Sequence, residues 1–554
     1  KNRINTLTDQ LLNILHTVNS KSLMWMNLTA ALKNIGTGHI NIVSEATGGE
    51  FTTKATLLKA HEMYIKALPS LWASLGEYTC NNLDAALMKL AGNIFEDHIE
   101  AGVDTKTNIV SLGMSKWDNV MFAPNTIGEH YLQFATFLSA MQTHRIVAGT
   151  IMNYDQFVFS LRERLFRDMV NDETYTKYKA YKDKQESVKG NNIEFIDYLS
   201  RFIAYRANNF TNEWKSNYAK AYKEDLKNAR VEFEKNQVIY DAFELKDGIA
   251  SIKAESNITL EDFAKFLGKV KGVNHSLHGI YNTFDKSMLS GKMWGEVILQ
   301  FRKWLRPNFI RYWGKRFGKT IYDERLESYR SGAYMDMINF LLSNGKSAYR
   351  ETIDKAIEND EDIDFTTKAK AIFNGFCGLL YWFKDINFRY NTLPQVQKAN
   401  IKRAMFNFTT LVGLSLVAAS LYAAKDDDDE LDENQFFALA CYTIYGVQTE
   451  LYETSPWGLY SFYKRTMEAP IPFETSMSNV LNLAYWTLIA PMIVDDEEML
   501  YDRGTYKDED KRWIAFKKTI PLFNQYNKMF YLPKNNTYYM QQNPILQMIV
   551  ELNK

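Results

Sequence analysis

The residues best suited to chemistry lie in one basic and aromatic stretch, residues 297–322, VILQFRKWLRPNFIRYWGKRFGKTIY. No carboxylate occurs between Glu296 and Asp323, although the whole chain has a net charge of −1. Cations interleaved with rings suit a polyanion, an anionic membrane surface or an acidic partner, because arginine pairs with phosphates and rings stack on bases. The alternative is a solvated helix whose tryptophans belong to the core. The candidate binding residues of this basic block are Arg302, Lys303, Trp304, Arg306, Arg311, Trp313, Lys315, Arg316 and Lys319.

Other spacings that could carry chemistry are incomplete. The segment GKRFGKT (314–320) has three residues between its glycines, where a phosphate-binding loop needs four. His275 and His278 have a spacing compatible with a metal pair, with Asp285 nearby, but the sequence places no third strong ligand. No nucleophile motif of serine or cysteine hydrolases occurs in the chain. The sequence therefore predicts no catalytic residue, no metal site and no cofactor, and hence a protein that is not an enzyme.

The composition predicts a mainly α-helical protein with a sizeable core. The chain has 554 residues, of which 46% are hydrophobic and 14% aromatic, and it contains only 11 prolines. Its three cysteines are far apart in apolar surroundings, which indicates buried thiols rather than a disulfide framework. The first residue is Lys1 rather than methionine, and we expect the chain to come from a longer polypeptide.

The first two of four expected segments differ in charge. Residues 1–150 predict a compact helical domain, in which Pro69 splits two helices. A linker is expected at 125–130 (NTIGEH), followed by an apolar helix-length run at 131–152. Residues 151–247 mix opposite charges with an aromatic stripe, which favours a stalk or hairpin of long exposed helices.

The third segment, residues 248–395, predicts a helical domain that carries the basic block. A short β-hairpin near 248–256 is the one place where β structure is expected. Thr259, followed by Glu261 and Asp262, indicates a helix start. An elongated, multi-domain helical assembly is the resulting expectation for the fold.

The fourth segment, residues 396–554, predicts an apolar helical region with acidic loops. Residues 404–424 contain no ionisable side chain over a length that could span a bilayer, with Lys402 and Arg403 before them and an acidic run after them. The alternatives are a buried core helix and a segment that enters a membrane after a conformational change. A further uncharged run, residues 480–494, is too short to span alone.

A resemblance covers about sixty residues, 275–334. The elements H-G-I-Y-N…D-K (His278 to Lys286), F-R-K-W-L-R-P (Phe301 to Pro307) and R-F-G…Y…G-x-Y (Arg316 to Tyr334) are similar to a segment of very large virion-associated proteins of crAss-like bacteriophages. The resemblance implies a protein packaged in the tail or capsid and delivered with the genome. It transfers no catalytic residue to this chain.

We therefore expect a non-enzymatic cargo protein, located in the virion and, after ejection, in the host cell. Its expected partners are other virion proteins of the tail, portal or capsid, and copies of itself. Phage DNA and a host membrane, reached through residues 404–424, are further candidates. The alternative functions are a membrane-inserting conduit for genome delivery and a nucleic-acid-binding protein that accompanies a virion RNA polymerase.

Overall fold

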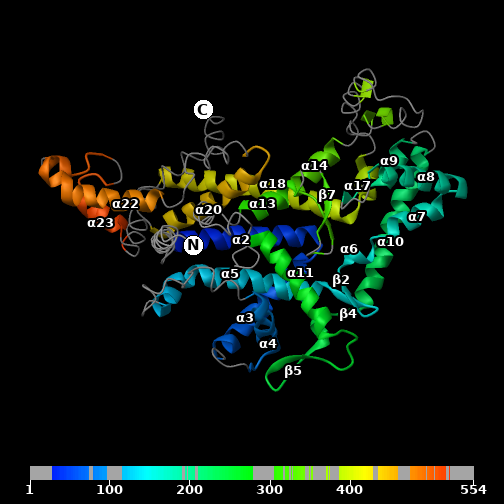
Figure 1. Cartoon of the computed structure of the whole chain (residues 1–554), viewed down its shortest axis with the longest axis horizontal. Helices are drawn as coiled ribbons and strands as arrows, with labels where there is room; N and C mark the ends of the chain where they lie inside the picture. Colours follow the sequence, from blue (N-terminus) through cyan, green and yellow to red (C-terminus); the bar gives the residue numbers. More distant parts are fainter. Residues whose placement is uncertain are drawn as a thin grey trace, which may run out of the picture.

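The structure, a computed structural model, confirms a mainly α-helical protein (Figure 1). Cys80 and Cys441 are buried free thiols, as expected, whereas Cys377 lies outside the described residues. The structure describes residues 28–73, 79–95, 115–189, 194–195, 197–205, 210–278, 305–315, 319–323, 326, 328–342, 348–349, 351–353, 368, 370–371, 374, 386–427, 435–458, 474–494, 496–503, 506–519 and 523.

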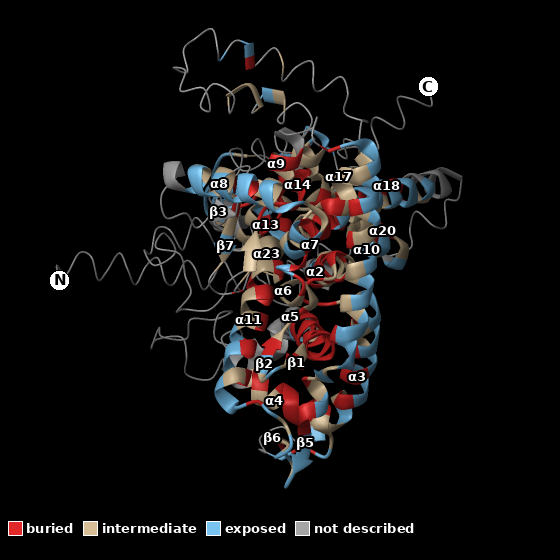
Figure 2. Cartoon of the chain, turned by 90° about the vertical axis from the view of Figure 1, so that its right-hand side faces the viewer, coloured by how far each residue is buried: buried red, intermediate tan, exposed pale blue. Residues whose placement is uncertain are grey.

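A single helix, α2 (Leu28–Gly48), lies at the centre of the fold. It packs on α5 (Ser115–Thr143) on one side and on α18 (Gln395–Asp427) and α20 (Gln435–Thr454) on the other (Figure 1). Buried residues gather along these inner faces, and the outward helical faces are exposed (Figure 2). Helices from the first and the last expected segments therefore share one core.

The largest hydrophobic core lies below this layer in Figure 1. It is enclosed by α5, α3 (Lys54–Ala73), α4 (Leu83–Phe95), α11 (Leu260–His278) and a hairpin of β5 (Phe243–Lys246) with β6 (Ile249–Ile252). The helix start predicted at Thr259 is confirmed, because its hydroxyl accepts from the Asp262 N–H at 3.2 Å. The aromatic members of the core are Tyr64, Phe134, Phe137, Phe243, Phe263 and Phe266.

Residues 154–235 fold around an aromatic core of their own. The elements are α6 (Tyr154–Phe157), α7 (Leu161–Met169), α8 (Asp172–Lys189), α9 (Tyr198–Tyr205) and α10 (Asn212–Lys235). The expected turn at 190–192 lies outside the described residues. The aromatic stripe of the sequence faces inward, so these helices share a core, whose largest rings are Phe166, Tyr178, Phe202, Phe210, Trp214, Tyr218 and Tyr222.

The described part of the basic block begins with helix α13 (Leu305–Trp313), which packs on α11 and α14 (Ala333–Leu341). Between α13 and α14 the chain forms β7 (Thr320–Asp323) and β8 (Ser328–Arg330). A short helix, α17 (Ile386–Thr392), then joins this region to α10.

The C-terminal elements form a projection at one end of the molecule, orange in Figure 1. A nearly continuous helical rod consists of α22 (Glu474–Ala484), the π-helical turn η4 (Tyr485–Ile489) and the 3₁₀ turn η5 (Ala490–Met492). The turn η6 (Asp496–Met499) then leads to α23 (Lys511–Thr519), which packs on α22.

The expected hairpin is confirmed, although its strands β5 and β6 lie at 243–252 rather than 248–256. The expectation that it is the only β structure is wrong. A second sheet has the order β2-β1-β4 and a third the order β3-β7-β8. These strands have two to four residues, too few for a period-two pattern to register. The elements not yet introduced are β1 (Arg145–Val147), β2 (Thr150–Met152), β3 (Glu194–Phe195), β4 (Gln237–Val238) and the 3₁₀ turn η3 (Tyr240–Ala242).

Three local expectations in the first segment are wrong. Helix α3 continues through Pro69. Proline has no N–H to donate to the Ile65 carbonyl, but both residues are exposed, so water can donate to that carbonyl instead. The expected linker at 125–130 lies inside α5. The apolar run at 131–152 is helical only to Thr143 and then forms the β1–β2 hairpin, whose turn contains Gly149 at φ 79°.

Candidate functional site

The central part of the basic block is buried rather than exposed. The Arg311 guanidinium donates to the side-chain and backbone oxygens of Asn41 on α2, both at 2.8 Å. Burial lowers the pKa of Arg311 below its ordinary value. The Trp313 indole donates to the carbonyl of Thr454 on α20 at 3.2 Å, and only 4% of Trp313 is exposed. Arg311 and Trp313 therefore anchor α13 to α2 and α20 and do not face a binding surface.

The other candidate residues of the block do not assemble one described surface. Lys315 is half-exposed and pairs with Asp323 at 2.8 Å, and Lys319 is exposed. Arg306 lies in the first turn of α13. Arg302, Lys303, Trp304 and Arg316 lie outside the described residues, so their predicted contact with a polyanion stays a prediction.

A buried charge cluster joins α18 to the end of α2. The Arg403 guanidinium donates to Glu45 at 2.5 Å and to Glu50 at 2.9 Å, and each carboxylate is about 1% exposed. Arg330 approaches the same carboxylates at 3.9 Å and 3.6 Å and lies 4.8 Å from the ring of Phe51. Burial would raise the pKa of Glu45, but the arginines, with Arg403 the strongest, outweigh it and hold that pKa below its ordinary value.

A second polar group, on α18 and α14, continues this cluster. Asn400 accepts from Arg403 at 2.7 Å and donates to Asp336 at 2.8 Å. The Ser331 hydroxyl also donates to Asp336. Burial raises the pKa of Asp336 to about 6, although both hydrogen bonds oppose the shift. Hydrogen bonds thus link Arg403 and Asn400 of α18 to Glu45, Glu50 and Asp336. Among the described residues, Glu45 Oε2, Glu50 Oε1 and Arg330 Nη2 have no hydrogen-bond partner.

The uncharged segment 404–424 lies within α18. Its inner face carries polar side chains, and its outward face carries large apolar ones. The inner face contains Asn407, one turn from Arg403, and Ser415, whose hydroxyl accepts from Gln448 of α20 at 2.7 Å. Among the described helices, none is sufficiently long and apolar to cross a membrane. The outward face of α18 instead exposes large apolar side chains, namely Met405, Phe408, Val412, Leu416 and Val417.

The two histidines of the incomplete metal spacing lie at the end of one helix. His275 and His278 lie in the last turn of α11, and His275 is buried, while Asp285 lies outside the described residues. Within the described ranges, no group of three potential metal ligands comes together.

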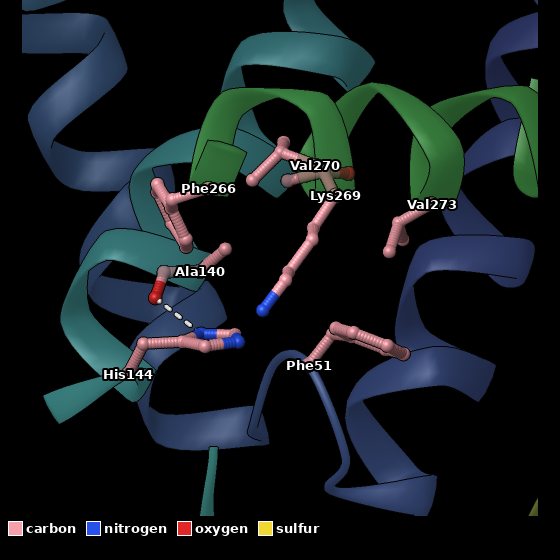
Figure 3. A pocket seen from close by; sticks show the side chains of 8 residues that line it. Phe51, Ala140, His144, Phe266, Lys269, Val270 and Val273 are labelled. Carbon is pink, nitrogen blue, oxygen red and sulfur yellow. Dashed lines mark hydrogen bonds between the residues drawn. The ribbon is translucent and has the colours of Figure 1, made fainter. Parts of the chain in front are cut away.

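A narrow pocket lies between α5 and α11 (Figure 3). His144 and Lys269 both project into it, beside Phe51 and Phe266. The His144 Nδ1–H donates to the Ala140 carbonyl at 3.0 Å, and burial, with a smaller effect of Lys269, lowers the pKa of His144 to about 4. The space has no room for a water molecule, so it is a packing defect rather than a binding site.

Sequence reasoning missed the charge cluster, although a signal existed. Arg403 was expected to be a basic flank of an apolar segment, together with Lys402. The structure exposes Lys402 and buries Arg403, because they occupy different faces of α18. Glu45 likewise interrupts the apolar face of α2. A single charge within an apolar helical stripe indicates that an oppositely charged partner is buried beside it. Local sequence does not identify that partner, because Arg403 and Glu45 are 358 positions apart.

Two residues of the segment that carries the resemblance, Gly332 and Tyr334, pack against α13. A side chain at Gly332 would approach the Trp313 backbone to 2.3 Å, so only glycine fits. Tyr334 stacks on Tyr312 with ring centroids 5.2 Å apart. Comparisons with protein-family models, with curated proteins and with solved structures find no match to this chain.

Proposed function

We propose that this protein is a non-enzymatic bacteriophage virion component, stored in the tail or capsid as cargo and ejected into the host with the genome. The proposal starts from the resemblance of residues 275–334 to virion-associated proteins of crAss-like phages. The described residues in that segment, such as Gly332 and Tyr334, serve packing. A role in assembly suits such residues, because they define a shape rather than a reaction.

The observation that carries the proposal is the outward face of α18. Phe408, Val412 and Leu416 are 45%, 44% and 60% exposed on a stretch without any charge. Contiguous apolar surface of this kind is a feature of proteins that bind other proteins. The inner face is fixed by the Arg403 cluster, so α18 cannot rotate to bury these side chains without breaking that cluster. We infer that neighbouring virion proteins cover this face in the particle.

Quantitative mass spectrometry of purified particles, and of cells just after adsorption, tests the proposal. We expect peptides of the chain in particles and their transfer into cells that have not yet begun synthesis of phage proteins. Appearance only late in infection, with none in particles, would rule out the virion role.

A matched pair of phage variants tests the role of α18. The triple change Phe408→Ser, Val412→Ser and Leu416→Ser should lower the number of copies per particle severalfold. The control Leu58→Ser and Ile65→Ser alters α3, where these residues are 73% and 62% exposed among charged neighbours. Equal copy numbers in both variants would show that α18 contacts no partner in the particle.

The two alternative functions stay predictions. A membrane conduit through residues 404–424 requires lipid association, which liposome flotation measures. DNA binding through the basic block requires an affinity that falls steeply with salt, because phosphate neutralisation releases counterions. The burial of Arg311 and Trp313 leaves the DNA-binding function without support from those two residues.

A further inference from the structure

Two histidines from different helices lie side by side at the edge of the central layer. His39 is on α2 and His61 is on α3. Their ring centroids are 5.2 Å apart, with an angle of 30° between the ring planes. Both residues are half-buried, so solvent and small ions can reach the two rings. We call these two residues the histidine pair.

A tyrosine of a third helix holds the ring of His61 at one of its two nitrogens. The His61 Nδ1 lies 2.9 Å from the hydroxyl oxygen of Tyr131 on α5, and the two rings stack with centroids 5.4 Å apart. In the tautomer whose Nδ1–H donates to this hydroxyl, the Nε2 atom keeps a lone pair. Metal-binding histidines commonly have this arrangement, in which one ring nitrogen donates to an oxygen and the other binds the ion.

The separation of the two rings equals that of two imidazoles bound to one zinc ion. Zinc binds an imidazole nitrogen at about 2.1 Å, which places the ion about 3.2 Å from the ring centre. Two rings bound at the tetrahedral angle therefore have their centres about 5.2 Å apart. The centroids of His39 and His61 are separated by 5.2 Å.

The charges around the histidine pair do not oppose a metal ion. Burial lowers the pKa of His39, and burial, followed by the neighbouring His39, lowers the pKa of His61. A lysine or arginine close to the pair would contribute to these shifts, and among the described residues none does. The pair therefore offers its nitrogens in surroundings without a competing cation.

We propose that the histidine pair binds a divalent transition-metal ion, with zinc matching the ring separation, and that the ion links α3 to the central helix α2. Helix α3 packs mainly on α5 and less on α2, so the ion adds a link where the two helices share few contacts. Imidazole nitrogens favour zinc, nickel and copper over magnesium and calcium, which prefer oxygen ligands.

Two protein ligands make this a reversible site. In the described part of the chain, no third histidine, cysteine, aspartate or glutamate joins the pair. Water therefore completes the four positions around the ion, whereas a structural zinc site fills all four with protein ligands. A chelator should remove the ion without unfolding the protein, because the core around α2 forms independently of it. The inference does not depend on the virion role, since it concerns the free protein in solution.

Isothermal titration calorimetry of the full chain with zinc chloride, after treatment with a chelator, tests the inference. Wild type should bind zinc, and excess magnesium should not compete. His39→Ala and His61→Ala should each weaken zinc binding more than about tenfold, because a single imidazole remains. The control His130→Ala removes a histidine of α5 whose Nδ1 lies 2.8 Å from the Tyr64 hydroxyl, and it should leave the zinc affinity unchanged.

Tyr131→Phe tests the orientation of His61 with a variant that keeps the stacked ring. Loss of the hydroxyl leaves the His61 Nδ1 without its partner, so the zinc affinity should fall about tenfold.

Thermal unfolding separates loss of the site from loss of stability. Zinc should raise the Tm of wild type and of His130→Ala, each compared with the same protein in chelator, but not the Tm of His39→Ala. Absence of zinc binding by wild type, unchanged affinity in both His39→Ala and His61→Ala, or equal binding of magnesium would overturn the inference and leave the histidine pair a packing contact.

Discussion

Two arginines of this protein have a structural role in the interior, although their local sequence indicates a surface role. Arg311 and Arg403 belong to a basic block and to a basic flank respectively, yet both are buried. A buried guanidinium is tolerated only where oxygens surround it, because the loss of hydration must be offset. Asn41 supplies those oxygens for Arg311, and Glu45 and Glu50 supply them for Arg403. These contacts hold α13 and α18 against α2.

Arg403→Met should destabilise the protein by about 3–5 kcal/mol, because two carboxylates lose their closest cation in the interior. The control Lys177→Met breaks an exposed pair with Glu173 and should cost about 0.5 kcal/mol or less. Urea denaturation measures both free energies of unfolding. Addition of Glu45→Gln and Glu50→Gln to Arg403→Met should recover part of the loss. A cost no greater than that of the control would contradict a structural role for the cluster.

His144 should make the protein sensitive to acid. The unfolded chain takes up a proton near pH 6.5, whereas the folded chain does so only near pH 4. The stability that neutral His144 contributes is therefore present above about pH 6.5 and is lost as the pH falls toward 4. Between pH 7 and pH 5 the loss should be about 2 kcal/mol. His144→Gln should reduce the difference between urea midpoints at these pH values; an unchanged difference would assign the acid sensitivity to other groups.

At the scale of elements, glycines set the distance between α2 and α5. A side chain at Gly128 of α5 would approach Ile35 to 2.4 Å, and one at Gly38 of α2 would approach Leu132 to 2.3 Å. Each helix thus contributes a glycine opposite a branched side chain of the other. This reciprocal contact explains why the expected break at 125–130 is helical: Gly128 serves close packing rather than a turn.

Gly128→Ala should destabilise the protein by about 1–3 kcal/mol through overpacking against Ile35. The same substitution at Gly268, exposed in α11 with open space around it, should stabilise by about 0.5–1 kcal/mol because alanine favours helix. Thermal unfolding compares the two variants. Ile35→Ala added to Gly128→Ala should relieve the overpacking, so independent, additive costs would refute the contact.

At the scale of the whole molecule, stability should be graded from the centre to the C-terminal projection. Helix α2 contacts α5, α18, α20, α3 and α11, whereas the strongest contacts of α22 and α23 are with each other and with η4. Regions with few long-range contacts open more readily than the centre of a core.

Hydrogen–deuterium exchange should therefore be slowest in α2 and markedly faster in α22 and α23 in dilute solution. Exchange in α22 as slow as in α2 at every concentration would show that the projection belongs to the main cooperative unit.

Much of the secondary structure could be predicted from local patterns. The scarcity of proline, the capping residues Thr259 and Asp262 and the presence of a hairpin near 248–256, observed at 243–252, are readable from neighbouring residues. The candidate site was less predictable. The block at 297–322 has the composition of a binding surface, but the same rings and cations suit a helix buried against polar partners, as Arg311 and Trp313 show.

The sequence by itself determined that this protein is mainly helical, that a helix begins after Thr259, and that residues 404–424 carry no charge. Only the tertiary structure decided which face of each helix is inside. Arg403 is buried because Glu45 and Glu50, more than 350 positions away, reach it. The apolar faces of α18 and α22 are exposed because the opposite sides of these helices already pack on α2, α20 and α23. Local periodicity records that a helix has two faces, whereas burial depends on what the rest of the chain brings to each face.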